Sequence, residues 1–214
     1  MKYVAIGVHL RREDVEPPAE AIPVGDLFLS AVAVPDDQSL GDRDLLLRVA
    51  EARARLLDKS TFVAVRYGFA FRSNAEAMAK CALHLQTWST ALRENSGRVE
   101  LTLKVAAAST SSRPDRHAFE KGADYLRALH AAKQAVTVDS KFRREVENRL
   151  GTLCAKWKWI TRDEASLEFC GLIDRDKLSE LSAAGQEIKA AQPDVPFLLS
   201  APWPLEVFTG ADYE

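Results

Sequence analysis

The chain has 214 residues, of which 47% are hydrophobic, and its 29 Lys and Arg against 31 Asp and Glu leave a net charge of −2. This length suits two domains of about 100 residues each, and the near balance of charge excludes nucleic acid and an anionic membrane as default partners. No apolar run approaches the roughly 18 residues of a membrane span, and the N-terminal one is too short for a signal peptide. Three cysteines without a CxxC pair are typical of a reduced, cytoplasmic chain.

The first half of the chain alternates between strand and helix patterns. It predicts a strand at residues 3–9, a loop with Pro17-Pro18, a strand at 26–34, a helix from 42, a strand at 61–65 and a helix from 73. The buried face of the first helix has apolar residues at steps of four, three and four: Leu45, Val49, Ala52 and Leu56. The second helix begins at a capping box, Ser73 with Glu76, and is predicted to bury Met78, Cys81, Leu85, Trp88 and Leu92. Gly97 ends this helix and is the predicted domain boundary.

The second half begins with strict alternation over residues 99–105, which predicts a strand with one solvated face. A small polar segment, residues 107–115, is predicted to be a mobile loop. Helical spacing then extends from Ala118 to Leu153, as one helix or as two broken near residues 137–139. A hairpin at residues 157–173, a helix from Leu178 to Ile188 and a last strand at residues 195–199 follow, with Pro196 favouring a sheet edge.

The predicted order of the second half is strand, helix, strand, strand, helix, strand, which is the ferredoxin-like, split βαβ arrangement. We therefore predict an α+β protein of two domains. Residues 1–97 form a small N-terminal α+β domain. Residues 98–214 form an antiparallel-sheet, ferredoxin-like domain with an extra helix and a Pro-Trp-Pro tail at residues 202–204. Trp157 and Trp159 lie on one face of a predicted strand, where burial under a helix is the favoured interpretation over an exposed contact surface.

The sequence contains no recognisable catalytic or cofactor motif. Its four histidines, His9, His84, His117 and His130, stand in no catalytic signature, and no HExxH, CxxC pair, GxGxxG or GxxxxGK[ST] occurs. Cys81 and Cys154 lie on or beside apolar helical stripes, which favours a role in the core. We predict no catalytic residues, no metal site and no cofactor.

The closing Pro202-Trp203-Pro204 places an aromatic side chain between two prolines, in an apolar setting near the chain end. Trp is costly to expose to water, so this pattern predicts a tail that is tied down on the body of the protein. We expect Trp203 to anchor the tail in the C-terminal domain.

Several segments, in order along nearly the whole chain, resemble the GvpF/GvpL family of gas vesicle proteins. Residues 63–71 are similar to the family's L-P-x-R-F-G-T-x-F strand, and residues 97–105 to its G-x-V-E-x-x-V-K strand. The closing residues 200–208 resemble its T-G-P-W-P-P-Y-S-F. Further similarities are YVAIGV at residues 3–8, VGDL at 24–27, GADYL at 122–126 and LIDR at 172–175. Singly these matches are weak, but in this order they are specific.

The resemblance implies a non-enzymatic protein that takes part in building gas vesicles. It also implies contact with the small, hydrophobic major shell protein, as a minor shell component or as an assembly factor, and with other gas vesicle accessory proteins. The candidate contact residues are Arg66 and Tyr67 in the strand signature, and Trp203 and Phe208 in the tail.

Two other classes of function stay open at this point. A pair of domains with a ferredoxin-like sheet is compatible with a small-molecule-sensing or regulatory protein, on fold analogy alone. An enzyme would use Cys154 or Cys170 with a histidine brought near it by the fold.

Overall fold

A computed structural model describes residues 1–106, 108–109, 114–134, 136–137, 139–163 and 166–209. By its internal contacts the chain divides into two units, and each is considered separately. The first contains residues 1–99 together with the chain end from Pro202, and the second contains residues 100–201. The first change of unit follows Val99, two residues after the predicted boundary at Gly97, and the chain from Pro202 onward groups with the first unit.

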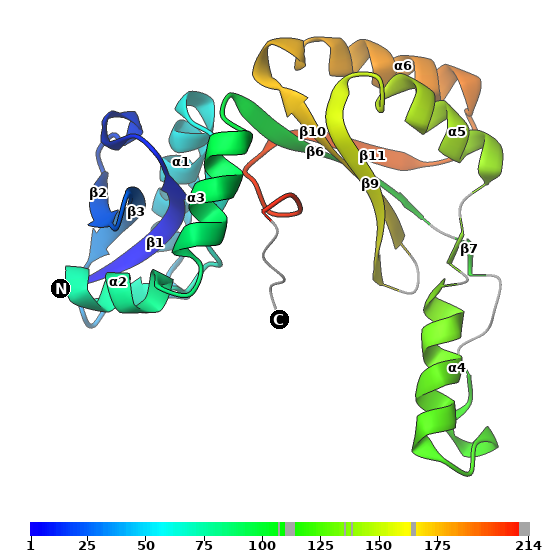
Figure 1. Ribbon diagram of the computed structural model, residues 1–214, viewed down its shortest axis with the longest axis horizontal. Helices are drawn as coiled ribbons and strands as arrows, with labels where there is room; N and C mark the ends of the chain where they lie inside the picture. Colours follow the sequence, from blue (N-terminus) through cyan, green and yellow to red (C-terminus); the bar gives the residue numbers. More distant parts are fainter. Residues whose placement is uncertain (107, 110–113, 135, 138, 164–165, 210–214) are drawn as a thin grey trace. The chain divides into compact units, whose positions relative to one another are not determined.

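An antiparallel sheet forms the centre of the first unit (Figure 1). Its main path runs β2-β3-β1-β4, and β5 pairs with β1 beside β4. The strands are β1 (Lys2–His9), β2 (Ala19–Val24), β3 (Leu27–Val34), β4 (Phe62–Ala64) and β5 (Ala70–Phe71). The helices are α1 (Arg43–Lys59), α2 (Asn74–Cys81) and α3 (Leu85–Glu94), and a 3-10 turn, η1, covers Arg12–Asp14.

Helix α1 follows the predicted pattern. The Asp42 side chain accepts a hydrogen bond from the Leu45 N–H, which caps the helix start. The predicted stripe is buried, and it packs against apolar side chains of β1, β3 and β4: Val4, Ile6, Val32, Val34 and Phe62. The periodicity of the sequence therefore identified both the helix and the face that enters the core.

Two local predictions in this unit are wrong. Residues 19–24 form strand β2 instead of a loop, and Pro23 is accommodated because β2 is at the sheet edge, where a missing N–H is tolerated. The single helix predicted from Ser73 is two helices with a turn between them, in which the His84 N–H donates to the Cys81 carbonyl. The break arises because α2 packs on β2 and β5 whereas α3 packs on β4. Met78, predicted to be buried, is 40% exposed as a result.

The second unit contains a four-stranded sheet in the order β11-β6-β10-β9 (Figure 1). Numbered within this unit the order is 4-1-3-2, which is the predicted ferredoxin-like arrangement. The strands are β6 (Arg98–Ala106), β9 (Cys154–Asp163), β10 (Ser166–Asp174) and β11 (Phe197–Trp203). Helices α5 (Ser140–Arg149) and α6 (Glu180–Ala191) pack side by side over the sheet. A 3-10 turn, η3 (Arg175–Lys177), precedes α6, and β11 is at the edge that Pro196 predicts.

An insertion between β6 and α5 holds the extra helix. It contains β7 (Ala108–Ser109), a 3-10 turn, η2 (Arg116–Ala118), helix α4 (Gly122–Gln134) and β8 (Val136–Thr137), and β7 pairs antiparallel with β8. The sequence left open whether the region after Ala118 forms one helix or two, and the structure contains two helices, α4 and α5. Residues 107 and 110–113 of the predicted mobile loop lie outside the described residues.

Trp157 and Trp159 are less deeply buried than we predicted. Both rings contact the buried Phe169, each with 5.4 Å between ring centroids. The Trp159 Nε1–H donates to Glu147 Oε1 of α5 at 2.9 Å, whereas Trp157 stays 41% exposed. The pair therefore shares one face of β9, and α5 covers only part of it.

Candidate protein-interaction site

The tail, defined here as residues 202–209, is fastened to strand β4. The Leu205 N–H donates to the Phe62 carbonyl at 2.8 Å, and the Ala64 N–H donates to the Leu205 carbonyl at 3.1 Å. These bonds form a parallel bridge between Val63 and Leu205. Because β4 ends the main path of the sheet, the tail covers a strand edge that would otherwise carry unpaired backbone groups.

Leu205, and not Trp203, is the apolar anchor of the tail. The Leu205 side chain is fully buried and Pro204 is buried beside it, whereas Trp203 is 49% exposed. After the anchor, the Thr209 hydroxyl donates to the Glu206 carbonyl at 2.9 Å and folds the chain back. These contacts confirm the prediction that the tail is tied down, but its buried anchor is Leu205 and not the predicted Trp203.

On one side of the tail is a cavity of about 260 Å³, the arginine pocket. Its lining comes from α1, from the chain around the end of β4, and from the tail: Arg53, Ala64, Val65, Arg66, Tyr67 and Glu206. The strand signature and the tail, far apart in the sequence, therefore meet here. Arg66 is exposed, and Tyr67 is half-buried with its hydroxyl donating to the Leu40 carbonyl.

The Arg53 guanidinium is held in place by backbone carbonyls. Its Nη2 donates to Val65 O at 2.7 Å and to Ile6 O at 3.1 Å, which ties α1 to β1 and to the segment after β4. Its Nε–H is buried and has no hydrogen-bond partner among the described residues. Burial lowers the pKa of Arg53, and attraction to Glu206 opposes this shift. Arg53 stays a cation in this setting, because an arginine is protonated at any physiological pH.

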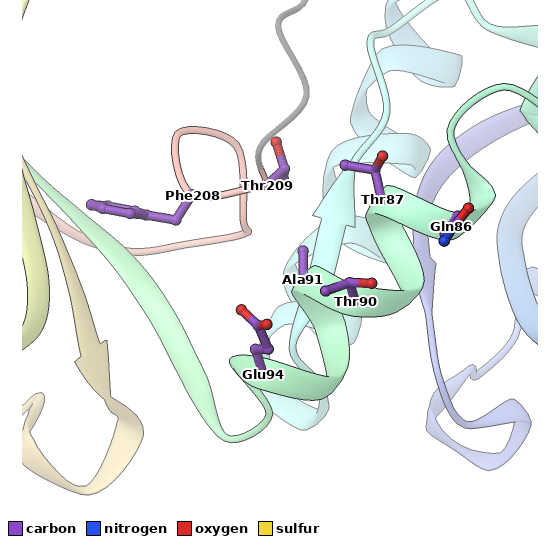
Figure 2. A pocket seen from close by; sticks show the side chains of 7 residues that line it. All are labelled: Gln86, Thr87, Thr90, Ala91, Glu94, Phe208 and Thr209. Atoms are coloured by element: carbon purple, nitrogen blue, oxygen red, sulfur yellow. The ribbon is translucent and has the colours of Figure 1, made fainter.

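A second cavity, of about 420 Å³, lies between α3 and the tail, and we call it the α3 pocket (Figure 2). Helix α3 contributes Gln86, Thr87, Thr90, Ala91 and Glu94, and the tail contributes Phe208 and Thr209. Figure 2 shows the α3 side chains along one side and the two tail residues on the other, with the Phe208 ring extending away from the helix. Hydroxyl, amide, carboxylate and aromatic side chains therefore line one cavity.

The structure brings some of the predicted contact residues together. Arg66 and Tyr67 line the arginine pocket and Phe208 lines the α3 pocket, so all three border the tail. Trp203 lines neither of these two cavities, although its side chain is half exposed. Sequence reasoning missed Arg53 and Glu206. Arg53 follows the buried Val49 by four residues and therefore lies beside the apolar stripe of α1. This position of a charged residue is the feature of the sequence that could have identified it.

The cysteines have the character of core residues. Burial raises the pKa of the Cys81 thiol to about 11 and that of Cys154 to about 12, and Cys170 is buried. A nucleophilic cysteine needs the opposite shift, toward the thiolate. Within the described part of the chain, His, Cys, Asp and Glu form no group of three that could hold a metal ion. Of the described helices, none combines the length and the apolar character that crossing a membrane requires.

The fold can be compared with solved structures. The crystal structure of gas vesicle protein GvpF from Microcystis aeruginosa aligns with a TM-score of 0.67 at 11% identity, over 98% of this chain and 99% of that one. The GvpF structure from Anabaena sp. PCC7120 aligns with a TM-score of 0.68 at 10% identity, over 99% and 97% of the two chains. The chain is thus a two-domain α+β protein with the fold of these gas vesicle proteins.

A family model shows the relationship in sequence. The model for the gas vesicle synthesis protein GvpL/GvpF matches residues 11–205, and the chain belongs to this family. Among curated proteins, none matches the sequence significantly. The family resemblance inferred from segments along nearly the whole chain is therefore confirmed, and the protein is a gas vesicle protein of the GvpF/GvpL type.

Proposed function

We propose that this protein helps to build gas vesicles by binding the small, hydrophobic major shell protein in the cytoplasm. It does so as an assembly factor or as a minor component of the shell, together with other accessory proteins, and it performs no catalysis. The observation that carries this proposal is the family match over residues 11–205. A small subunit rich in apolar strands would aggregate if left uncovered, so a partner that covers its strands would keep it available for assembly.

The surface that we propose for this contact is the tail with its two flanking cavities. It includes the half-exposed Trp203, Phe208 of the α3 pocket, and Arg66 and Tyr67 of the arginine pocket. Aromatic and arginine side chains are the residue types that dominate the energy of protein interfaces. The buried Leu205 anchor holds this surface on β4, so little order has to be gained on binding.

Co-purification tests the proposal. The tagged chain is co-expressed with the major shell protein, and we expect the shell protein to be retained. Trp203→Ala and Phe208→Ala should each weaken retention by about tenfold, as interface aromatics do. Trp157→Ala is the matched control, because Trp157 is exposed to a similar extent on the second unit. A chain that never retains the shell protein, or a deletion that leaves vesicle formation normal, would contradict the proposal.

A further inference from the structure

Two arginines, Arg53 and Arg66, line the arginine pocket beside the tail. Arg66 is exposed and, among the described residues, forms no ion pair, and the buried Arg53 Nε–H lacks a hydrogen-bond partner. Neither arginine forms an ion pair among the described residues, and attraction to the Glu206 carboxylate offsets part of the positive charge of the pocket.

The charges of the residues that line the pocket determine the charge of the group that it can bind. Two guanidinium groups and the Glu206 carboxylate give the pocket a formal charge of +1. Guanidinium groups bind carboxylate and phosphate oxygens in pairs through their planar N–H groups. One added carboxylate therefore leaves the pocket neutral, whereas a phosphate dianion leaves it with a net negative charge and meets stronger repulsion from Glu206.

The volume of the cavity and the apolar residues in its lining limit the class of ligand further. At about 260 Å³ the cavity is smaller than the roughly 300–1,000 Å³ of sites that enclose cofactors and drug-sized ligands. Ala64, Val65 and Tyr67 line the cavity together with the charged residues, and this mixed composition suits a short aliphatic stem that ends in a carboxylate. The Tyr67 hydroxyl already donates to the Leu40 carbonyl, so its proton is not available to a bound group.

We propose that the arginine pocket binds the carboxylate of an Asp or Glu side chain that a protein partner inserts between Arg53 and Arg66. Glu206, carried by the tail, partly neutralises the pocket in the unbound protein and competes with the incoming group. The inference deepens the proposed function, because it names the group by which a partner would engage this surface.

A fragment titration tests the pocket without any partner. The ¹⁵N-labelled full chain is titrated with N-acetyl-glutamic acid amide, which carries one side-chain carboxylate, and with the neutral N-acetyl-glutamine amide. We expect amide shifts at Val65, Arg66 and Tyr67 with a dissociation constant on the order of 10 mM for the acid, and none for the neutral analogue. The absence of saturable shifts with the acid, or equal binding of both, would overturn the proposal.

Variants separate the pocket from general charge effects. Arg66→Ala should weaken binding of the acid by about tenfold, and Glu206→Gln should strengthen it by about threefold. Arg12→Ala, at an exposed arginine on η1, should change it by less than about twofold, and thermal melts check that each variant is folded. Binding that is unchanged by Arg66→Ala would overturn the assignment. Tighter binding of inorganic phosphate than of the acid would also overturn it, in favour of a site for free oxyanions.

The experiments test the proposed function and the proposed carboxylate site independently. A wild-type chain that binds the capped glutamate but never retains the shell protein supports the pocket and contradicts the proposed function. A chain that retains the shell protein but gives no fragment binding overturns the pocket and leaves the proposed function standing.

Discussion

Leu205 and Phe62 are joined through their backbones, with the Leu205 N–H donating to the Phe62 carbonyl at 2.8 Å. This bond connects residues far apart in the sequence and completes the first unit with the end of the chain. It also positions Glu206, Phe208 and Thr209 at the two cavities, so the stability of the tail and the geometry of the candidate site depend on the same contact.

Removal of the Leu205 side chain should destabilise the first unit. Leu205 is fully buried, and Leu205→Ala leaves a cavity that costs about 2–5 kcal/mol of unfolding free energy, measured by chemical denaturation. Leu198→Ala, at a leucine that is 66% exposed, should cost less than about 0.5 kcal/mol. Truncation after Ser200 removes the whole tail and should be at least as damaging as Leu205→Ala. A truncated chain that melts like the full one would show that the tail contributes nothing to stability.

Gly7 should tolerate no side chain. A Cβ at this position would lie 2.2 Å from Cδ2 of the buried Phe62 ring and 2.8 Å from the Val63 carbonyl oxygen. Gly7→Ala therefore forces β1 and β4 apart, and we expect a loss of about 1–3 kcal/mol in unfolding free energy. The control is Gly41→Ala, where the nearest atom, Ser39 Oγ, is 3.7 Å from the new Cβ. Equal melting temperatures for the two variants would be inconsistent with this close approach.

His9 should make stability depend on pH near neutrality. Its ring is buried, Nδ1 donates to the Arg11 carbonyl at 2.8 Å, and Nε2 accepts from the Ser30 hydroxyl at 2.7 Å. Burial lowers the pKa of His9 below its ordinary value of 6.5. The unfolded chain therefore binds a proton that the folded chain does not, and stability is lost as the pH falls through 6.5.

Urea denaturation from about pH 7.5 to about pH 5.5 measures this effect. The unfolding free energy should fall toward the acidic end and then level off below the folded-state pKa of His9. His9→Gln should flatten the profile, whereas His117→Gln, at an exposed histidine, should leave its shape unchanged. Carboxylates such as Asp42, whose pKa is lowered by its helix-capping hydrogen bond to Leu45, titrate at more acidic pH. A stability that rises on acidification would contradict the assignment of a neutral buried imidazole.

Cys81 and Cys154 should react slowly in the native protein. Because burial raises their pKa values to about 11 and about 12, almost no thiolate is present at neutral pH. We expect iodoacetamide to modify both cysteines only slowly, and to modify them rapidly once urea unfolds the chain, as followed by peptide mass spectrometry. Rapid modification of native Cys154 would instead favour the cysteine-enzyme alternative.

Local patterns in the sequence were sufficient for most of the helices and strands. The stripe Leu45, Val49, Ala52 and Leu56 identified the buried face of α1, and the alternation over residues 99–105 identified β6 with its buried side chains. The order of elements after Gly97 then indicated the ferredoxin-like sheet. Such patterns succeed because the side-chain period of a helix or strand is a local property that burial of one face imposes on the sequence.

The candidate site depended on contacts that no local pattern records. Arg66, Tyr67, Trp203 and Phe208 could be named from the sequence. It did not reveal that the first two line one cavity, that Phe208 lines another and that Trp203 lines neither, nor that Arg53 lines the first. Tertiary structure alone decided that Leu205 pairs with β4 and buries its side chain while Trp203 stays half exposed. The physical reason is that the apolar character of a side chain favours its burial but does not determine its position. The position depends on an open strand edge and on unfilled space in the core, and only the folded chain creates these.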